Sequence, residues 1–555
     1  MAYELLNQTF GQKLDEITEL YPKNEAIVCP EKNIRWDYRE FRDRVNKVAK
    51  GLYAIGIGKG DHVAIWATNY PEWILTMFAT ARIGAVMVTV NTNYRNFELN
   101  YLLKQSDSMT LIMSKGTKEV DYVEMINKLC PTLEFSAPGE LESEDFPFLK
   151  NIIYLEDEKV DGMFNFSQLY EFADYVSDFE LKLAEQRTAL HDVVNMQYTS
   201  GTTGFPKGVM LTHYNVVNDG KAIGDCMKFT HNDRLCIPVP LFHCFGCVLG
   251  VTAAITHGTT IVLIDHFNPL TVMQALQDEK CTAVHGVPTM YIAMLNHERF
   301  KEFDFSTMRT GIMAGSPCPI EVMRQVVDKM HMPEITIAFG QTEASPVCTQ
   351  TTTDDPLEVR VKTVGRALPH IECRIVDPET NQELPRNTPG EFVARGYNIM
   401  KGYYNMPEAT ALAIDAEGWL HTGDLAMQDD DGYYHITGRI KDMIIRGGEN
   451  IYPKELEELL YTHPQIRDVQ VIGVPDERYG EVVMACIIAI EDALLTEEEV
   501  KEFVKENVAK HKIPQYVAFV ESFPMTASGK IQKFKMREDA IEKLGLANAA
   551  KIETA

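Results

Sequence analysis

The stretch of sequence that most constrains fold and function is Tyr198-Thr199-Ser200-Gly201-Thr202-Thr203-Gly204-Phe205-Pro206-Lys207-Gly208. It combines three glycines, four serine or threonine hydroxyls and one lysine. Glycine lets backbone N–H groups approach a phosphate closely, the hydroxyls add donors, and lysine supplies a mobile positive charge. The pattern therefore predicts a loop that binds phosphates, and the alternative is a flexible polar turn.

This loop differs from a Walker loop. The Walker pattern needs glycine directly before the lysine and serine or threonine directly after it. Here Pro206 precedes Lys207, and Gly208 follows it. The stretch is therefore a different kind of phosphate loop.

The sequence before this loop alternates between helical and strand patterns. Tyr38 to Ala54 predicts an amphipathic helix, because its apolar residues recur at helical spacing. His62 to Trp66 and Val86 to Val90 predict short buried strands. The glycines between residues 56 and 60 predict a helix-ending turn, since they follow a helix and do not match a dinucleotide fingerprint. The alternation predicts an α/β domain with a largely parallel sheet.

The middle of the chain continues this pattern and then changes. Leu235 to Val239, Thr260 to Ile264 and Thr336 to Phe339 predict buried strands. From Ile371 to Arg395, short strands are separated by turn residues such as Pro389-Gly390. This part is predicted to be antiparallel or barrel-like.

A smaller unit begins after about Gly438. Pro453 predicts the start of a helix with leucines on one face, and Val469 to Val474 and Val482 to Ile490 predict strands. The chain has 555 residues, whereas a single core stops growing near roughly 250–300 residues. We therefore expect two domains, residues 1–438 and 439–555, of which the second is a compact α+β domain.

Composition narrows the classes of partner. The net charge, 53 basic minus 80 acidic residues, is −27, which argues against a general nucleic-acid or anionic-membrane binder. The most apolar segment, Ile74 to Val90, contains Arg82 and is shorter than the ~20 residues of a membrane span. The N-terminus has early acidic residues and no apolar signal core, so a cytoplasmic protein without a leader is expected. The oligomeric state, monomer or homodimer, stays open.

The 11 cysteines are scattered and odd in number, which favours a reducing compartment over a disulfide framework. Cys244 and Cys247 form one C-x-x-C motif among apolar neighbours. No second pair of ligands lies nearby, so packed thiols are favoured over a zinc or redox site.

Two further stretches join the phosphate loop in a resemblance to a known family. They are GRIKDMIIRGGENIYPKELE at residues 438–457 and TASGKIQKFKMRE at residues 526–538. Over essentially its whole length the chain resembles the adenylate-forming enzymes, which include acyl-CoA synthetases, luciferases and peptide-synthetase adenylation domains, and most strongly the medium-chain acyl-CoA synthetases. The resemblance implies a large α/β domain with a small barrel-like β part, followed by a small α+β lid domain.

The resemblance implies a set of residues that contact ATP or AMP. They are Thr199, Ser200, Gly201, Thr202, Thr203, Gly204, Lys207, Gly315, Ser316, Pro317, Phe339, Gly340, Thr342, Asp424, Arg439 and Lys530.

Three of these residues, together with Glu343, receive specific roles from the resemblance. Thr342 would contact the α-phosphate, Glu343 next to it would hold Mg²⁺, and Asp424 would accept hydrogen bonds from both ribose hydroxyls. Phe339 stands where the family usually has tyrosine, so adenine stacking is kept and a hydroxyl contact is lost. Taken alone, Thr342-Glu343 also fits a helix N-cap, and Gly423-Asp424 also fits a turn.

The small domain would contribute Lys530 as the catalytic lysine, which binds the carboxylate of the acid and the α-phosphate. Lys441 would be the hinge about which this domain rotates, and Gly447 and Gly448 would let the pantetheine arm of CoA pass close to the backbone. For Lys441 the alternative is an exposed basic loop, and for Lys530 it is a solvated turn.

The acyl side of the site is implied less directly. His243, in Pro240-Leu241-Phe242-His243, would lie beside the carboxylate, with a hydrogen-bonded core histidine as the alternative. Val287, Ala338 and Gly340 would line the acyl pocket. A basic run at residues 530, 533, 535 and 537 either holds the phosphates of CoA or is a solvated surface.

The resemblance implies an AMP-forming acid–CoA ligase. ATP and a carboxylic acid would give an acyl-adenylate, which CoA converts to acyl-CoA and AMP, with Mg²⁺ as the cation. A medium-chain fatty acid is the first choice, and aryl, alicyclic or short branched acids stay open. The alternatives are transfer to a carrier protein, which the lack of a carrier domain after Ala555 disfavours, a luciferase-like oxygenase and a non-catalytic nucleotide-binding scaffold.

Overall fold

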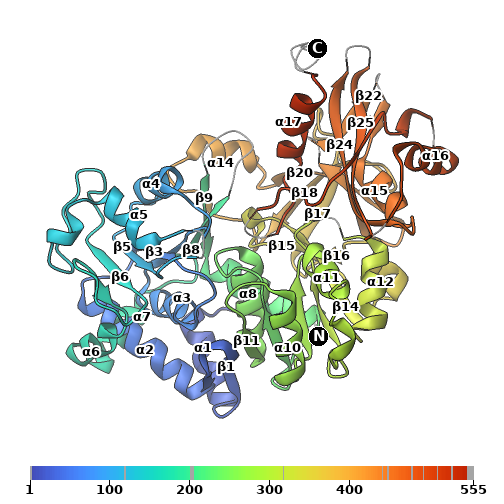
Figure 1. The fold of residues 1–555 in the computed structure, drawn as a ribbon. Helices are drawn as coiled ribbons and strands as arrows, with labels where there is room; N and C mark the ends of the chain where they lie inside the picture. The colour runs from blue at the N-terminus through green and yellow to red at the C-terminus, as the bar shows by residue number, and fades with distance from the viewer. Residues whose placement is uncertain are drawn as a thin grey trace.

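The structure is a computed structural model that describes residues 3–117, 120–199, 206–316, 318–439, 442–446, 449–476, 479–491, 493–508, 510–526 and 529–546. Two large sheets with helices on their faces form most of the N-terminal part, a curled antiparallel sheet follows, and a small unit with its own sheet ends the chain (Figure 1). This is the predicted fold class, an α/β domain with a barrel-like part and a small α+β domain.

The first large sheet contains the phosphate-loop hairpin. In spatial order its strands are β19 (Gly402–Tyr403), β9 (Lys207–Thr212), β8 (Val193–Thr199), β4 (Val86–Thr89), β3 (His62–Trp66), β5 (Thr110–Met113), β6 (Asn151–Tyr154) and β7 (Phe164–Asn165). The strands from β8 to β7 pair in parallel, and β9 and β19 add an antiparallel edge.

The second large sheet is also mainly parallel in its centre. Its strands in spatial order are β16 (Arg366–Ala367), β15 (Val347–Gln350), β14 (Glu334–Gly340), β13 (Thr310–Met313), β12 (Ala283–Gly286), β10 (Arg234–Ile237), β11 (Thr260–Leu263), β1 (Glu25–Cys29) and β2 (Ile34–Asp37). The pairs at each end of this sheet are antiparallel.

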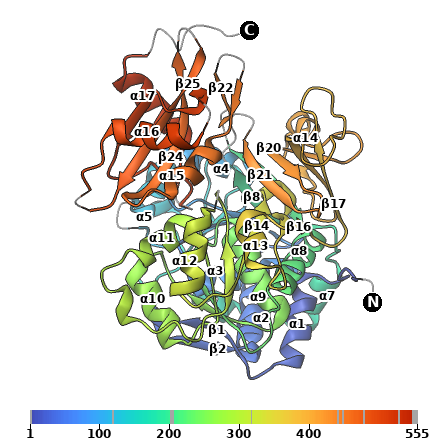
Figure 2. The same ribbon diagram turned by 90° about the vertical axis from the view of Figure 1, so that its right-hand side faces the viewer.

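Helices cover these two sheets (Figures 1 and 2). They are α1 (Phe10–Leu20), α2 (Tyr38–Ala54), α3 (Pro71–Ile83), α4 (Asn96–Gln105), α5 (Tyr122–Leu129), α6 (Gln168–Phe172), α7 (Asp178–Gln186), α8 (His213–Cys226), α9 (Ala253–His257), α10 (Pro269–Asp278), α11 (Pro288–Leu295), α12 (Ile320–Lys329), α13 (Leu357–Lys362) and α14 (Pro407–Ala413). A π-helix, η4 (Phe245–Thr252), runs directly into α9.

The barrel-like part and the small domain are antiparallel in the main. The curled sheet has the strands β17 (Ile371–Val376), β18 (Gly390–Gly396), β20 (Leu420–Gln428) and β21 (Tyr434–Arg439). The small domain contains β22 (Ile444–Arg446), β23 (Glu449–Ile451), β24 (Ile466–Asp476), β25 (Gly480–Ala489), β26 (Tyr516–Phe519), α15 (Pro453–Tyr461), α16 (Glu497–Asn507) and α17 (Lys533–Lys543).

Local sequence patterns located many of these elements. The helix predicted at Tyr38–Ala54 and the strand predicted at His62–Trp66 have those bounds in the structure, and Gly56 and Gly60 adopt positive φ angles in the predicted helix-ending turn. The other predicted strands are confirmed with ends that differ by a few residues, and Pro453 begins α15. The predicted domain boundary at 438/439 falls at the end of β21 and stays a prediction.

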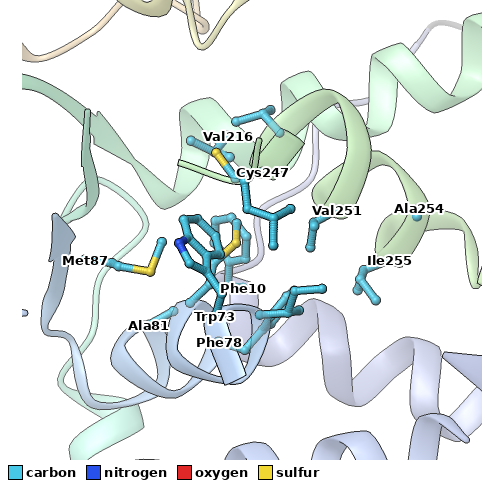
Figure 3. Close-up of a cluster of buried hydrophobic side chains, with 14 of the residues drawn as sticks. Phe10, Trp73, Phe78, Ala81, Met87, Val216, Cys247, Val251, Ala254 and Ile255 are labelled. Atoms are coloured by element: carbon cyan, nitrogen blue, oxygen red, sulfur yellow. The ribbon is translucent and has the colours of Figure 1, made fainter. Parts of the chain in front are cut away.

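One apolar core joins the two large sheets. Phe10, Trp73 and Phe78 come from α1 and α3, and they meet Cys247 and side chains of α9 (Figure 3). The Phe78 ring lies 5.4 Å from that of Phe10 and 5.5 Å from that of Phe41, each pair edge to face. Every residue of η4 is buried, so this helix packs within a core that contains side chains from both sheets.

The C-x-x-C motif belongs to this core region. Cys244 and Cys247 are buried free thiols, as the sequence predicts. Within the described residues, no group of three or more His, Cys, Asp or Glu side chains is arranged to hold a metal ion. None of the helices described is long and apolar enough to cross a membrane.

Replacing Phe78 with alanine should lower thermal stability strongly. The side chain is 1% exposed, and deleting a buried phenylalanine costs about 3–5 kcal/mol. Phe179→Ala is the matched control, because that ring is 69% exposed. Thermal unfolding followed by circular dichroism measures both, and equal melting temperatures for the two variants would contradict the packing described.

Candidate active site

A cavity of about 1420 Å³ lies where the two large sheets, the curled sheet and the small domain meet. Its wall includes Lys207 from β9, Gly340 from β14, Gly423 from β20 and Lys530 from the small domain. In parallel α/β sheets, ligands bind at the carboxyl ends of the strands, and β14 ends at this cavity. The cavity therefore collects residues from segments that are far apart in sequence.

The phosphate-loop hairpin borders the cavity. Thr199 at the end of β8 pairs with Lys207 at the start of β9, so the strands hold the two ends of the loop together. Thr199 and Lys207 both line the cavity. The predicted loop residues Ser200, Gly201, Thr202, Thr203 and Gly204 lie outside the described part of the chain.

Thr342 and Glu343 follow directly after β14, in the short 3-10 helix η6 (Thr342–Ala344). Both line the cavity, and Thr342 Oγ1 lies 3.7 Å from Cys244 Sγ. The hydroxyl of Tyr403 donates a hydrogen bond of 2.8 Å to Glu343 Oε1. The Glu343 carboxylate is therefore fixed in direction at the edge of the cavity.

This carboxylate fits a divalent cation. Mg²⁺ is commonly held by one or two carboxylates together with phosphate oxygens and water. A carboxylate offers about four lone-pair positions, so the bond from Tyr403 leaves further positions for a cation. Glu343 is the residue that would hold Mg²⁺, and the remaining oxygen ligands would come from the nucleotide and water.

Lys530 brings a positive charge from the small domain into the cavity. Its backbone N–H donates to Thr526 Oγ1 at 3.0 Å, and Gly529 before it has a φ of +78°. A Cβ at Gly315 would lie 3.6 Å from Lys530 Cε, so the lysine side chain passes against the Gly315 backbone. Thr289 Oγ1 also lies 3.4 Å from the Gly529 carbonyl oxygen, so the small domain contacts the large one here.

His243 stands near this lysine. Its Nδ1 accepts a hydrogen bond from the backbone N–H of Phe245 at 3.1 Å. Burial, and then the positive charge of Lys530, hold the pKa of His243 well below its usual range. Burial likewise raises the pKa of the Cys244 thiol to about 11. At neutral pH the ring and the thiol are both uncharged, so Lys530 and Lys207 supply the positive charge on this side.

The structure places the remaining predicted nucleotide-binding residues differently: some line the cavity, some lie off its wall, and some are outside the described residues. Gly315, Phe339 and Gly340 line the cavity, and the Phe339 ring packs edge to face on Phe392 at 5.1 Å. Asp424 is 5% exposed in β20 and lies opposite Arg439 of β21 in the antiparallel register, while its neighbour Gly423 borders the cavity.

Ser316 is half-buried next to Gly315 and does not belong to the cavity wall. Pro317, Lys441, Gly447 and Gly448 lie outside the described residues, as does the side chain of Arg439.

On the acyl side, Ala338 and Gly340 line the cavity together with His243. Val287 is 1% exposed and does not belong to the cavity wall, although a Cβ at the wall residue Gly315 would lie 3.1 Å from its side chain. Phe245 and Leu249 of η4 complete the apolar wall. They escape sequence reasoning because apolar residues of a core helix and of a pocket look alike.

The four basic residues of the small domain fall into two pairs with different surroundings. Lys533 Nζ lies 2.6 Å from the buried Glu457 carboxylate, and Arg537 pairs with Glu481 at 2.5 Å. Lys535 and Lys530 line the cavity. Two of the four cations therefore stabilise the small domain, and two face the cavity.

A model of the AMP-binding enzyme family matches residues 14–404, and a model of the AMP-binding enzyme C-terminal domain matches residues 455–530. The chain belongs to the AMP-binding enzyme family. A relative from Bacillus subtilis strain 168, YngI, is named as an acyl-CoA synthetase and is 53% identical over 98% of this chain and 100% of its own length.

Two further comparisons show what the chain is similar to in sequence and in fold. The bovine mitochondrial medium-chain acyl-CoA ligase ACSF2 is 41% identical over 98% of this chain and 90% of its own. The crystal structure of the anthranilate CoA ligase AuaEII with anthranoyl-AMP superposes with a TM-score of 0.86 at 24% identity, over 98% of this chain and 99% of that one. The last likeness shows the shared fold.

Acidification should destabilise the wall that carries His243. His285 is buried between the Phe229 and Phe245 rings, and burial lowers its pKa from 6.5 to about 4. Between these values the unfolded chain binds the proton and the folded chain does not, so this contribution to stability is lost as pH falls from 6.5 towards 4. Melting temperatures across this range should fall in the wild type.

A His285→Gln variant should show a weaker dependence on pH, because it lacks this titrating group. His266→Gln is the control, since the His266 side chain is 60% exposed. An identical pH profile in wild type and His285→Gln would show that His285 does not cause the acid sensitivity.

Proposed function

We propose that this protein is an AMP-forming acid–thiol ligase that activates medium-chain fatty acids and transfers the acyl group to coenzyme A. The observation that carries the proposal is the presence of Lys530 from the small domain in one cavity with Lys207, Thr342 and Glu343 of the large domain. The identities with YngI and ACSF2 support an acyl-CoA ligase. The name of ACSF2 supports the medium-chain class of acid.

In the first step the carboxylate of the acid attacks the α-phosphorus of ATP, and pyrophosphate leaves. The P–O bond to pyrophosphate breaks as the bond to the carboxylate oxygen forms, so no covalent bond to the protein is needed. Lys530 binds the incoming carboxylate and the α-phosphate, and Lys207 binds the leaving phosphates. These cations reduce the repulsion between two anions and hold them in line.

The Mg²⁺ held by Glu343 and the nucleotide would add positive charge at the phosphates. Thr342 donates its hydroxyl to the α-phosphate. His243 is neutral and lines the acyl side, so it orients the acid without adding charge. Phe339 stacks on adenine, and Asp424 binds the ribose.

In the second step CoA attacks the carbonyl carbon of the acyl-adenylate. The thiolate forms the thioester, and AMP leaves with the bonding electrons. The small domain rotates about Lys441, which withdraws Lys530 and brings Gly447 and Gly448 to the pantetheine arm. One mobile domain therefore assembles the two sites in turn.

The variant Lys530→Ala should separate the two half-reactions. Adenylate formation should fall at least ~10²-fold, the scale of one preorganised charged donor, while CoA transfer from a supplied acyl-adenylate is kept. Lys441→Pro should show the opposite pattern. Release of pyrophosphate measures the first step, and release of AMP from the supplied acyl-adenylate measures the second. Equal loss of both steps in Lys530→Ala would show that the role given to this lysine is wrong.

A panel of acids tests the substrate class. Acyl-CoA formation should peak at about six to ten carbons when acids from acetate to palmitate, benzoate and cyclohexanecarboxylate are compared with ATP, Mg²⁺ and CoA. The highest rate with benzoate would instead indicate an aryl-CoA ligase. Acid-dependent exchange of pyrophosphate into ATP without acyl-CoA would point to a protein-bound acceptor, and no reaction in either assay would refute the ligase.

A further inference from the structure

Tyr403 lies between two charged groups of the cavity, and the sequence patterns give it no role. It belongs to the two-residue strand β19, which pairs antiparallel with β9, and its side chain is 7% exposed. Tyr403 itself lines the cavity. Its backbone N–H donates to Thr410 Oγ1 at 2.9 Å, so the strand is anchored on the side facing α14 as well.

The hydroxyl of Tyr403 fixes the Glu343 carboxylate. It donates to Oε1 at 2.8 Å, and the neighbouring Met400 N–H donates to the Glu343 carbonyl oxygen at 2.8 Å. One short segment of chain therefore fixes both the backbone and the side chain of Glu343. A hydrogen bond to a charged acceptor is among the stronger ones in proteins.

The ring of Tyr403 holds the Lys207 ammonium. Nζ lies 4.6 Å from the ring centroid, within the range of a cation–π interaction. Among the described residues no salt bridge joins Lys207 to Glu343, and each of the two groups instead contacts Tyr403. Opposite charges that share a cavity attract, and a direct pair would make each group less available to a ligand.

We propose that Tyr403 is a positioning residue that holds Lys207 and Glu343 apart, so that the lysine meets the phosphates of ATP and the carboxylate meets Mg²⁺. This inference rests on the proposed function for its ligand. The hydroxyl orients Glu343, which would hold the metal, and the ring orients Lys207, which binds the phosphates. Changes to the two parts of this side chain therefore have different effects.

Tyr403→Phe tests the hydroxyl, because it keeps the ring. In acid-dependent pyrophosphate–ATP exchange, the free Mg²⁺ concentration for half-maximal rate should rise about tenfold, the scale of one lost hydrogen bond to a charged acceptor. The rate at saturating Mg²⁺ should change less than about threefold, because the lysines are unaffected. Calorimetry of ATP binding without acid, at low and high Mg²⁺, should show the same shift without any turnover.

Tyr403→Leu tests the ring. It should show the Mg²⁺ effect and also a further rise of about threefold in the dissociation constant for ATP at saturating Mg²⁺, since the ring no longer orients Lys207. If this variant does not fold, the phenylalanine variant alone decides the question.

Tyr404→Phe is the matched control. The Tyr404 hydroxyl donates to Asp107 Oδ2 at 2.9 Å, away from both charged groups. Its Mg²⁺ dependence and ATP affinity should equal those of the wild type. The proposal is overturned if Tyr403→Phe matches this control, or if its rate falls while Mg²⁺ dependence and ATP affinity stay normal, as a merely structural role requires.

The calorimetry separates this inference from the proposed function. If the wild type forms no acyl-CoA, yet Tyr403→Phe still weakens Mg²⁺-dependent ATP binding, the ligase is refuted and the positioning role stands. If the wild type is an active ligase and Tyr403→Phe binds ATP normally, the proposed function stands and the positioning role of Tyr403 is refuted.

Discussion

The apolar core between the two large sheets is the constraint on which the site depends. Phe10, Trp73 and Phe78 pack against η4, which is buried throughout its length (Figure 3). Residues just before and within this π-helix, His243, Cys244 and Phe245, form the wall of the cavity. The apolar core therefore supports the wall of the cavity at which β8, β9 and β14 present polar residues.

Charge within the cavity opposes the charge of the whole chain. The protein carries a net charge of −27, and ATP, a carboxylate and CoA are all anions. Lys207, Lys530 and Lys535 gather at one cavity, while Lys533 and Arg537 are paired with carboxylates. Binding of anions therefore depends on a few local cations, whose positions matter more than the overall charge. Side chains that orient these cations, such as Tyr403 beside Lys207, therefore also affect the binding of anions.

Local patterns in the sequence predicted what local forces determine. The periodicity of Tyr38–Ala54 and the alternating elements around it predicted the α/β architecture. The hairpin of β8 and β9 that flanks the phosphate loop was not predicted. Tyr403 was not predicted, because a two-residue strand has no periodicity and is placed only by pairing with β9. Val287 was predicted to line the acyl pocket and is not part of the described cavity wall, because sequence position alone does not say which buried side chain reaches the cavity surface. The roles of the residues in the cavity stay predictions that rest on the family resemblance.

Lys530 lies near His243, and after burial its positive charge is the second cause of the low pKa of this ring. In the domain rotation proposed above, carrying Lys530 away would remove that charge and raise the pKa of His243. Such linkage is reciprocal, and a proton on His243 therefore disfavours the position in which Lys530 occupies the cavity. Under the proposed rotation, the equilibrium between the two positions of the small domain would therefore depend on pH, and the protonation of His243 would differ between them.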